Sequence, residues 1–174
     1  MILRSTPGFD DPIGLLSACH RRVERFLGVL RLVANEPPGP LAGEAPEALA
    51  QALRYFHEAG PRHTADEEES LIPRLLALGH PRVGALQPRI AALHADHRAA
   101  EALHAEVAAL GRAWLEGALE VGARDRFGAA VEALEAIYTP HIAFEDEELF
   151  PLAERLLSLE ERLAIGREMA GRRG

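Results

Sequence analysis

Two segments of the chain repeat one pattern, and their shared spacing constrains the fold more than any other feature of the sequence. Residues 63–73 and 141–151 align without a gap, and in each a histidine is followed four residues later by a glutamate and ten residues later by a proline. Residues four apart lie on the same face of a helix. Each segment therefore predicts a helix that presents an imidazole beside a carboxylate. Two such pairs, His63 with Glu67 and His141 with Glu145, predict a metal site.

The composition favours a helical globular protein and excludes several functional classes. Hydrophobic residues make up 48% of the 174 residues and charged residues 26%, and the helix-favouring alanine, leucine, glutamate and arginine are abundant. The net charge of -8 argues against binding to nucleic acid or to an anionic membrane surface, because both need clustered positive charge. The single cysteine, Cys19, excludes an internal disulfide and a cysteine-rich zinc or iron–sulfur motif.

Prolines and glycines divide the chain into long helical stretches, and no stretch alternates with period two for long enough to form a sheet. Ser158 to Glu161 resembles a capping box and predicts a short C-terminal helix. The four long helices expected before it are residues 12–34, residues 45–78 with a break at Gly60 and Pro61, a helix with an apolar stripe from Leu86 to Trp114, and one with a stripe from Phe127 to Leu156.

Four long helices with short connections predict an all-α fold, an antiparallel up-down four-helix bundle. We expect a single domain, residues 1–174, with the bundle core at about 10–157 and the short fifth helix at about 158–170. Pro61 and Pro140 lie just before the two motif histidines. We expect each proline to kink its helix there, or to begin a new helical segment.

The repeat extends backward to two further histidines. His20 lies 43 residues before His63, and His97 lies 44 residues before His141, each on the apolar stripe of the preceding helix. Each half therefore reads as a helix with one inward histidine, a loop, and a helix with the histidine–glutamate pair. A pseudo-twofold relation would bring the two halves together around one centre. Six inward ionisable groups are costly in a helical core without a metal, so we expect the metal-free bundle to be markedly less stable.

This order of histidines and glutamates closely resembles that of the hemerythrin-like HHE cation-binding domains, over roughly residues 10–157. The resemblance implies a non-heme centre of two iron ions, bridged by an oxo or hydroxo group, inside a four-helix bundle. It implies that two glutamates span both ions and that four histidines complete the set: His20, His63, Glu67, His97, His141 and Glu145. Imidazole with carboxylate also suits iron or manganese on chemical grounds.

The chain departs from the oxygen-carrying hemerythrins in two places. Those proteins have a pair of histidines four residues apart on the third helix, whereas here His94 and His97 are three apart. Their last carboxylate is an aspartate five residues after the fourth-helix histidine, which corresponds to Asp146. We favour His97 and Glu145 because both keep the repeat in register, and His94 stays open as an additional ligand. Without His94, one iron has an open position, which favours reactivity over reversible carriage.

Four other polar residues lie close to the predicted ligands in the sequence. Glu24 and Glu101 each follow a predicted ligand histidine by four residues, and they are either hydrogen-bond acceptors for the ligand imidazoles or salt-bridge partners of neighbouring arginines. Tyr138 lies one turn before His141, where it either packs in the core or hydrogen-bonds a ligand of the metal. We expect His104, two turns beyond His97, to be a core residue or to hydrogen-bond a metal ligand.

The sequence as a whole predicts a cytoplasmic diiron protein that binds or senses O2, peroxide, NO or iron, with slow oxidase or peroxidase-like turnover as an additional outcome. Cytoplasmic location is expected because the chain shows neither a signal-peptide pattern nor a stretch of transmembrane length. The partner expected is this small ligand, with no nucleic acid and no membrane. One alternative is a ferritin-like iron oxidase or storage protein, although those sites use Glu-x-x-His with mostly carboxylates. Another is a metal-independent helical interaction module.

Overall fold

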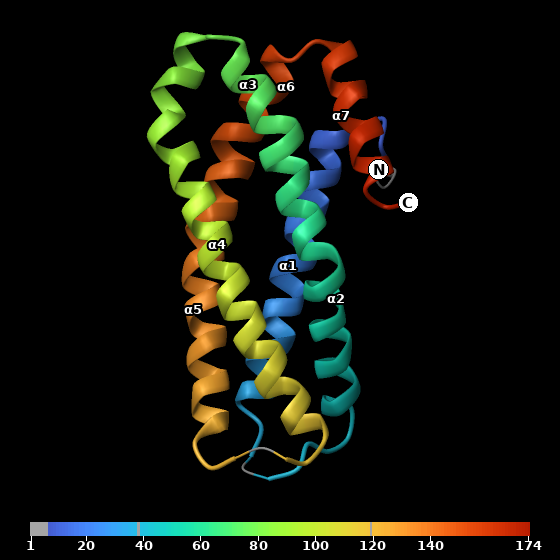
Figure 1. Cartoon of the computed structure of the whole chain (residues 1–174), viewed down its shortest axis with the longest axis vertical. Helices are drawn as coiled ribbons and strands as arrows, with labels where there is room; N and C mark the ends of the chain where they lie inside the picture. Colours follow the sequence, from blue (N-terminus) through green and yellow to red (C-terminus); the bar gives the residue numbers. More distant parts are fainter. Residues whose placement is uncertain (1–6, 38, 119) are drawn as a thin grey trace, which may run out of the picture. The chain divides into compact units, whose positions relative to one another are not determined.

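The computed structural model describes residues 7–37, 39–118 and 120–174, and within these residues every regular element is a helix (Figure 1). The all-α prediction is therefore confirmed, while the antiparallel up-down arrangement stays a prediction. No helix in the described ranges combines the length and apolar character needed to cross a membrane. The elements in chain order are α1 (Pro12–Ala34), α2 (Ala45–Ala65), η1 (Asp66–Leu71), α3 (Ile72–Ala77), α4 (Pro81–Leu115), α5 (Ala123–Phe144), η2 (Glu145–Leu149), α6 (Phe150–Leu156) and α7 (Leu159–Gly171).

Helix ends follow the local signals that the sequence carries. Helix α1 has the predicted bounds. At the start of α7, the Ser158 hydroxyl accepts the Glu161 backbone N–H at 3.2 Å, and the Glu161 carboxylate accepts the Ser158 N–H at 2.8 Å. This reciprocal pair confirms the predicted capping box. Gly79 and Gly117, which follow α3 and α4, have positive φ angles of 58° and 71°, the left-handed conformation that ends many helices.

The two prolines before the motif histidines do not interrupt their helices. Helix α2 contains Pro61 and helix α5 contains Pro140, and both helices extend past the proline, to Ala65 and to Phe144. The expected break at Gly60 and Pro61 is therefore wrong, and so is the expectation that either proline begins a new helical segment. The alternative expectation, a kink at each proline, stays a prediction. Departure from α geometry comes later, at the glutamates themselves.

Elements η1 and η2 are short π-helical stretches, and each begins at or beside a motif glutamate. The Glu67 carbonyl accepts the N–H of Ile72, and the Glu145 carbonyl accepts the N–H of Phe150, so both bonds span five residues rather than four. A proline follows each of these donors by one residue. Proline lacks an N–H and crowds the carbonyl four residues before it. We attribute the wider turns to this crowding, and π turns of this kind are frequent at functional sites.

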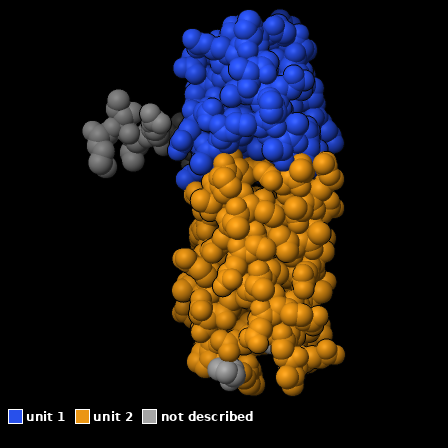
Figure 2. Space-filling model, turned by 90° about the vertical axis from the view of Figure 1, so that its left-hand side faces the viewer, with its two compact units in different colours: residues 1–21, 61–94, 142–174 blue, residues 22–60, 95–141 orange. Residues whose placement is uncertain are grey.

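The described chain forms two compact units, coloured separately in Figure 2. The first unit comprises residues 1–21, 61–94 and 142–174, so it contains both π-helical stretches and α7. The second comprises residues 22–60 and 95–141. Each unit has its own buried apolar residues, among them Leu16, Leu71, Leu149 and Ile165 in the first and Leu30, Phe56, Phe127 and Leu134 in the second. The prediction of a single domain stays a prediction.

Candidate metal centre

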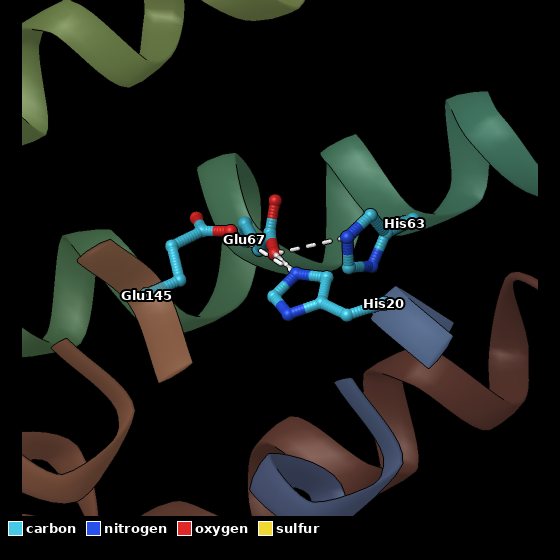
Figure 3. A group of neighbouring side chains, drawn as sticks. All are labelled: His20, His63, Glu67 and Glu145. Atoms are coloured by element: carbon cyan, nitrogen blue, oxygen red, sulfur yellow. Dashed lines mark ion pairs between the residues drawn. The ribbon is translucent and has the colours of Figure 1, made fainter. Parts of the chain in front are cut away.

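Four of the six predicted ligands lie together in the first unit. His20 comes from α1, His63 from α2, Glu67 from η1 and Glu145 from η2, and Figure 3 shows these side chains gathered around a common point. Each offers one ligand atom, and these atoms lie within 4.8 Å of one another. All four residues are buried, with exposed fractions of 1%, 8%, 0% and 0%. Atoms that share one ion at about 2 Å are at most about 4 Å apart, so small side-chain movements would enclose a metal.

The histidine and the glutamate of the first motif face each other as the four-residue spacing predicts. His63 Nε2 lies 3.3 Å from Glu67 Oε1. The ring of His20 approaches from α1, with Nε2 at 3.1 Å from Glu145 Oε2 and 3.8 Å from Glu67 Oε1. The His20 ring stacks on Phe150 and meets the His63 ring edge-on, with centroids 5.3 Å and 5.0 Å away. These packing contacts limit how far the imidazoles can turn.

The electrostatics of this group favour a cation. Burial alone would lower the pKa of His20, but hydrogen bonds to the Asp146, Glu145 and Glu67 carboxylates and the charge of Glu67 outweigh it and raise this pKa to about 11. Without a metal, the imidazole therefore carries a proton at neutral pH. A metal ion at Nε2 would replace that proton and would neutralise the same buried carboxylates.

Asp146 hydrogen-bonds the opposite edge of the His20 ring. Its Oδ1 accepts a hydrogen bond from His20 Nδ1 at 2.9 Å and another from the Ser17 hydroxyl at 2.9 Å, and Arg21 pairs with Oδ2. Burial alone would raise the pKa of Asp146, but the hydrogen bonds and charges of His20, Ser17 and Arg21 hold it below its usual range. Asp146 thus fixes the tautomer that leaves Nε2 available to a metal. In this structure Asp146 lies outside the four-residue group and contacts the predicted ligand His20 from the other edge of its ring, while Glu24 is exposed.

The other two predicted ligands, His97 and His141, lie in the second unit. Their ring centroids are 4.8 Å apart, and the His141 side chain is 2% exposed. Asp96 Oδ2 lies 3.3 Å from His141 Nδ1, so His141 has an aspartate on its Nδ1 edge as His20 does. Sequence reasoning missed Asp96. Its signal was weak, since an aspartate beside a predicted ligand is common on any solvated helix.

His94 does not join the four-residue group in the first unit. Its Nδ1 lies 2.8 Å from Glu68 Oε1, and its side chain is 35% exposed. The imidazole is thus in an ion pair near the surface, which disfavours its open role as an additional ligand.

His104 and Tyr138 form a polar contact inside the second unit. His104 Nε2 lies 3.0 Å from the Tyr138 hydroxyl, and the His104 ring stacks on Phe56 with centroids 4.3 Å apart. Tyr138 also meets the His141 ring edge-on at 6.1 Å between centroids. His104 is thus half-buried and packs against Phe56 and Tyr138, which favours the first of the two expectations for it. Burial lowers the pKa of His104 to about 4.

This lowered pKa has an expected effect on stability. His104 has a pKa of 6.5 in the unfolded chain and of about 4 in the folded chain. The free energy of unfolding therefore keeps the full contribution of neutral His104 above pH 6.5, and it falls as the pH is lowered from 6.5 towards 4. The metal-free wild type should lose free energy of unfolding when the pH is lowered from 7 to 5. We expect this loss to be smaller by about 2 kcal/mol in His104→Gln. Urea unfolding at the two pH values measures this difference. The matched control is His57→Gln, at an exposed position of the same unit, and an equal effect there would contradict the assignment.

Comparison with known proteins agrees with the geometry of the four-residue group. The model of the Hemerythrin family, described as the hemerythrin HHE cation binding domain, matches residues 11–153. An uncharacterized protein of Haemophilus influenzae is 31% identical over 167 residues, which cover 95% of this chain and 91% of that protein. Both motifs and all six predicted ligands fall within the matched residues. The chain belongs to the hemerythrin HHE cation-binding family.

Proposed function

We propose that the protein holds two non-heme iron ions and binds or senses O2, peroxide, NO or iron through them. The observation that carries the proposal is the buried group of two imidazoles and two carboxylates, in which the ligand atoms lie within 4.8 Å of one another. Buried carboxylates without a cation are costly. Nitrogen and carboxylate donors without thiolate suit iron and manganese better than copper(I).

His97 and His141 would help to hold the second ion of the proposed pair. Support comes from the internal repeat, which places these histidines at the positions that correspond to His20 and His63. Further support comes from their close packing, with centroids 4.8 Å apart, and from Asp96 on the Nδ1 edge of His141. An aspartate on Nδ1 leaves Nε2 for a metal.

Iron bound at such a site supplies a Lewis acid that can change oxidation state, and the protein side chains determine what reaches it. Phe150 stacks on His20 and, with Leu149, supplies buried apolar surface at the end of η2. Apolar walls exclude water and favour small neutral ligands over ions. The apolar surface beside His20 therefore supports binding of O2 or NO. We include slow oxidase or peroxidase-like turnover in the proposal. The cytoplasmic location also stays a proposal.

Metal analysis with optical spectroscopy tests the proposed centre. We expect protein purified without chelators to contain about two iron ions per chain, with charge-transfer absorption that changes on adding O2, peroxide or azide. His63→Ala and His141→Ala should each lower the iron content, while His57→Ala, at an exposed position, should not. Protein that holds one zinc ion and is unaffected by His63→Ala would overturn the proposal. Accumulation of a ferric mineral would instead favour the storage alternative.

A further inference from the structure

Helix α7 lies outside the residues that match the family model, yet it contacts the turn that carries Glu67. Two of its apolar residues, Ile165 and Met169, are fully buried in the core of the first unit. In the middle of this helix, Gly166 lies against the Phe9 backbone so closely that a Cβ there would be 1.8 Å from the Phe9 carbonyl oxygen. The position of α7 on the unit is therefore closely determined by packing.

Just beyond α7, Arg172 and Arg173 bind the carboxylate of Asp66, and we call these two residues the arginine pair. Arg172 Nη1 donates to Asp66 Oδ1 at 3.0 Å, and Arg173 Nη2 donates to Oδ2 at 2.6 Å. Asp66 is completely buried. A buried carboxylate needs such partners because an unpaired charge in the interior is strongly unfavourable. The arginine pair therefore determines where this carboxylate can lie.

Further hydrogen bonds join the same two elements. Arg172 Nη2 donates to the Ser70 hydroxyl at 2.9 Å and to Glu69 Oε2 at 3.1 Å. The Ser70 hydroxyl donates to Glu168 Oε2 at 2.6 Å. Arg74, in α3, donates to both Glu168 oxygens at 3.0 and 2.7 Å. Asp66, Glu69 and Ser70 of η1 are thus tied by charge-assisted bonds to α7 and to the arginine pair that follows it.

Asp66 and Glu67 are neighbours in the chain, but they face different parts of the unit. Successive helical residues point about 100° apart, so the turn can direct Glu67 toward His20 and His63 while it directs Asp66 toward the arginine pair. Rotation of η1 about its axis would move both carboxylates together. Fixing Asp66 therefore fixes the direction of Glu67.

The second π-helical turn has a related arrangement. Phe144 lies three residues after His141, as Asp66 lies three residues after His63. The guanidinium of Arg89, in α4, lies 3.9 Å from the centroid of the Phe144 ring, and Arg89 also pairs with Glu148. Each glutamate-bearing turn thus has a carboxylate paired with an arginine from another part of the chain. Only in the first turn does that arginine contact a buried carboxylate beside a ligand.

We propose that the arginine pair positions Glu67 through Asp66 and so sets how tightly the site holds its metal. Helix α7 then acts as a positioning element for a site that lies in the matched family region. This inference rests on the proposed iron centre. The arginine pair consists of positioning residues, because the two guanidiniums bind Asp66, which does not belong to the four-residue group.

The test compares iron release from the full-length protein loaded anaerobically with Fe2+ and mixed with a coloured Fe2+ chelator. Replacing partners of metal ligands commonly costs about 10- to 100-fold in metal affinity, so we expect Arg172→Ala with Arg173→Ala to release iron at least about tenfold faster. Asp66→Asn keeps the shape of the side chain and should act in the same direction. Arg167→Ala, at an exposed position of α7, is the matched control and should release iron as the wild type does.

A purely structural role gives a different result. It would lower the melting temperature of the metal-free and iron-loaded forms equally and leave the release rate unchanged, which would overturn the inference. If the double variant does not fold, Arg173→Lys keeps the charge but loses the two-nitrogen geometry, and unchanged release from it and from Asp66→Asn would also overturn the inference. If the wild type itself binds no iron, the proposed function fails instead.

Discussion

Glu67→Gln is expected to abolish the stabilisation that a metal gives to this protein. Glu67 is completely buried and lies within ion-pair distance of both His20 and His63. A ligand at a thousand times its dissociation constant stabilises the folded state by about 4 kcal/mol. For a chain of this length, that corresponds to a rise in melting temperature of roughly 8–16 °C. We therefore expect thermal unfolding of the wild type to shift by this amount on addition of Fe2+ and to return on chelation, whereas Glu67→Gln should show neither change.

The control for this experiment is Glu147→Gln, which removes a carboxylate from an exposed position of η2. It changes the net charge by the same amount, so it separates loss of a ligand from loss of a surface charge. A metal-dependent shift that survives in Glu67→Gln would contradict the assignment of Glu67. Loss of the shift in both variants would mean that overall negative charge, rather than one ligand, attracts the metal.

Asp146→Ala is expected to weaken metal binding by about 10- to 100-fold without removing a ligand. The carboxylate accepts hydrogen bonds from His20 Nδ1 and from the Ser17 hydroxyl, so its loss frees the imidazole to turn and to change tautomer. Asp146→Asn keeps an acceptor for Nδ1–H, so we expect it to lose less affinity than Asp146→Ala. Competition with a chelator of known affinity measures all three proteins.

Ser17→Ala is the matched control for Asp146, because it removes a different hydrogen bond to the same carboxylate while leaving the bond from His20. We expect its affinity to lie close to that of the wild type. Equal and complete loss of binding in Asp146→Ala and Asp146→Asn would show that Asp146 is a direct ligand. Unchanged affinity in both would show that His20 needs no orienting partner.

The sequence predicted those parts of the fold and the site that depend on local spacing. Helix α1 and the capping box of α7 have strong end signals, and both were predicted correctly. His63 and Glu67 face each other because a four-residue spacing brings two side chains together on any helix. The internal repeat then identified His20, which joins them in the structure.

Features that depend on contacts between distant segments were not predicted. Asp146 bonds to His20 across 126 residues of sequence, and Asp66 is buried by an arginine pair more than 100 residues away. A run of acidic residues reads as a solvated helix face unless the neighbouring helix is known. The effect of proline was also misplaced, because Pro61 is accommodated within α2 while the chain departs from α geometry from Asp66 onward.

The first unit is assembled from three separate stretches of chain, residues 1–21, 61–94 and 142–174. His20 is made early, whereas Glu145, Asp146 and α7 are made late during translation. Until those residues have left the ribosome, His20 lacks Asp146 on one edge of its ring and Glu145 on the other. We therefore expect metal loading to follow synthesis of this chain rather than accompany it, and a nascent chain that ends before Glu145 should not retain iron.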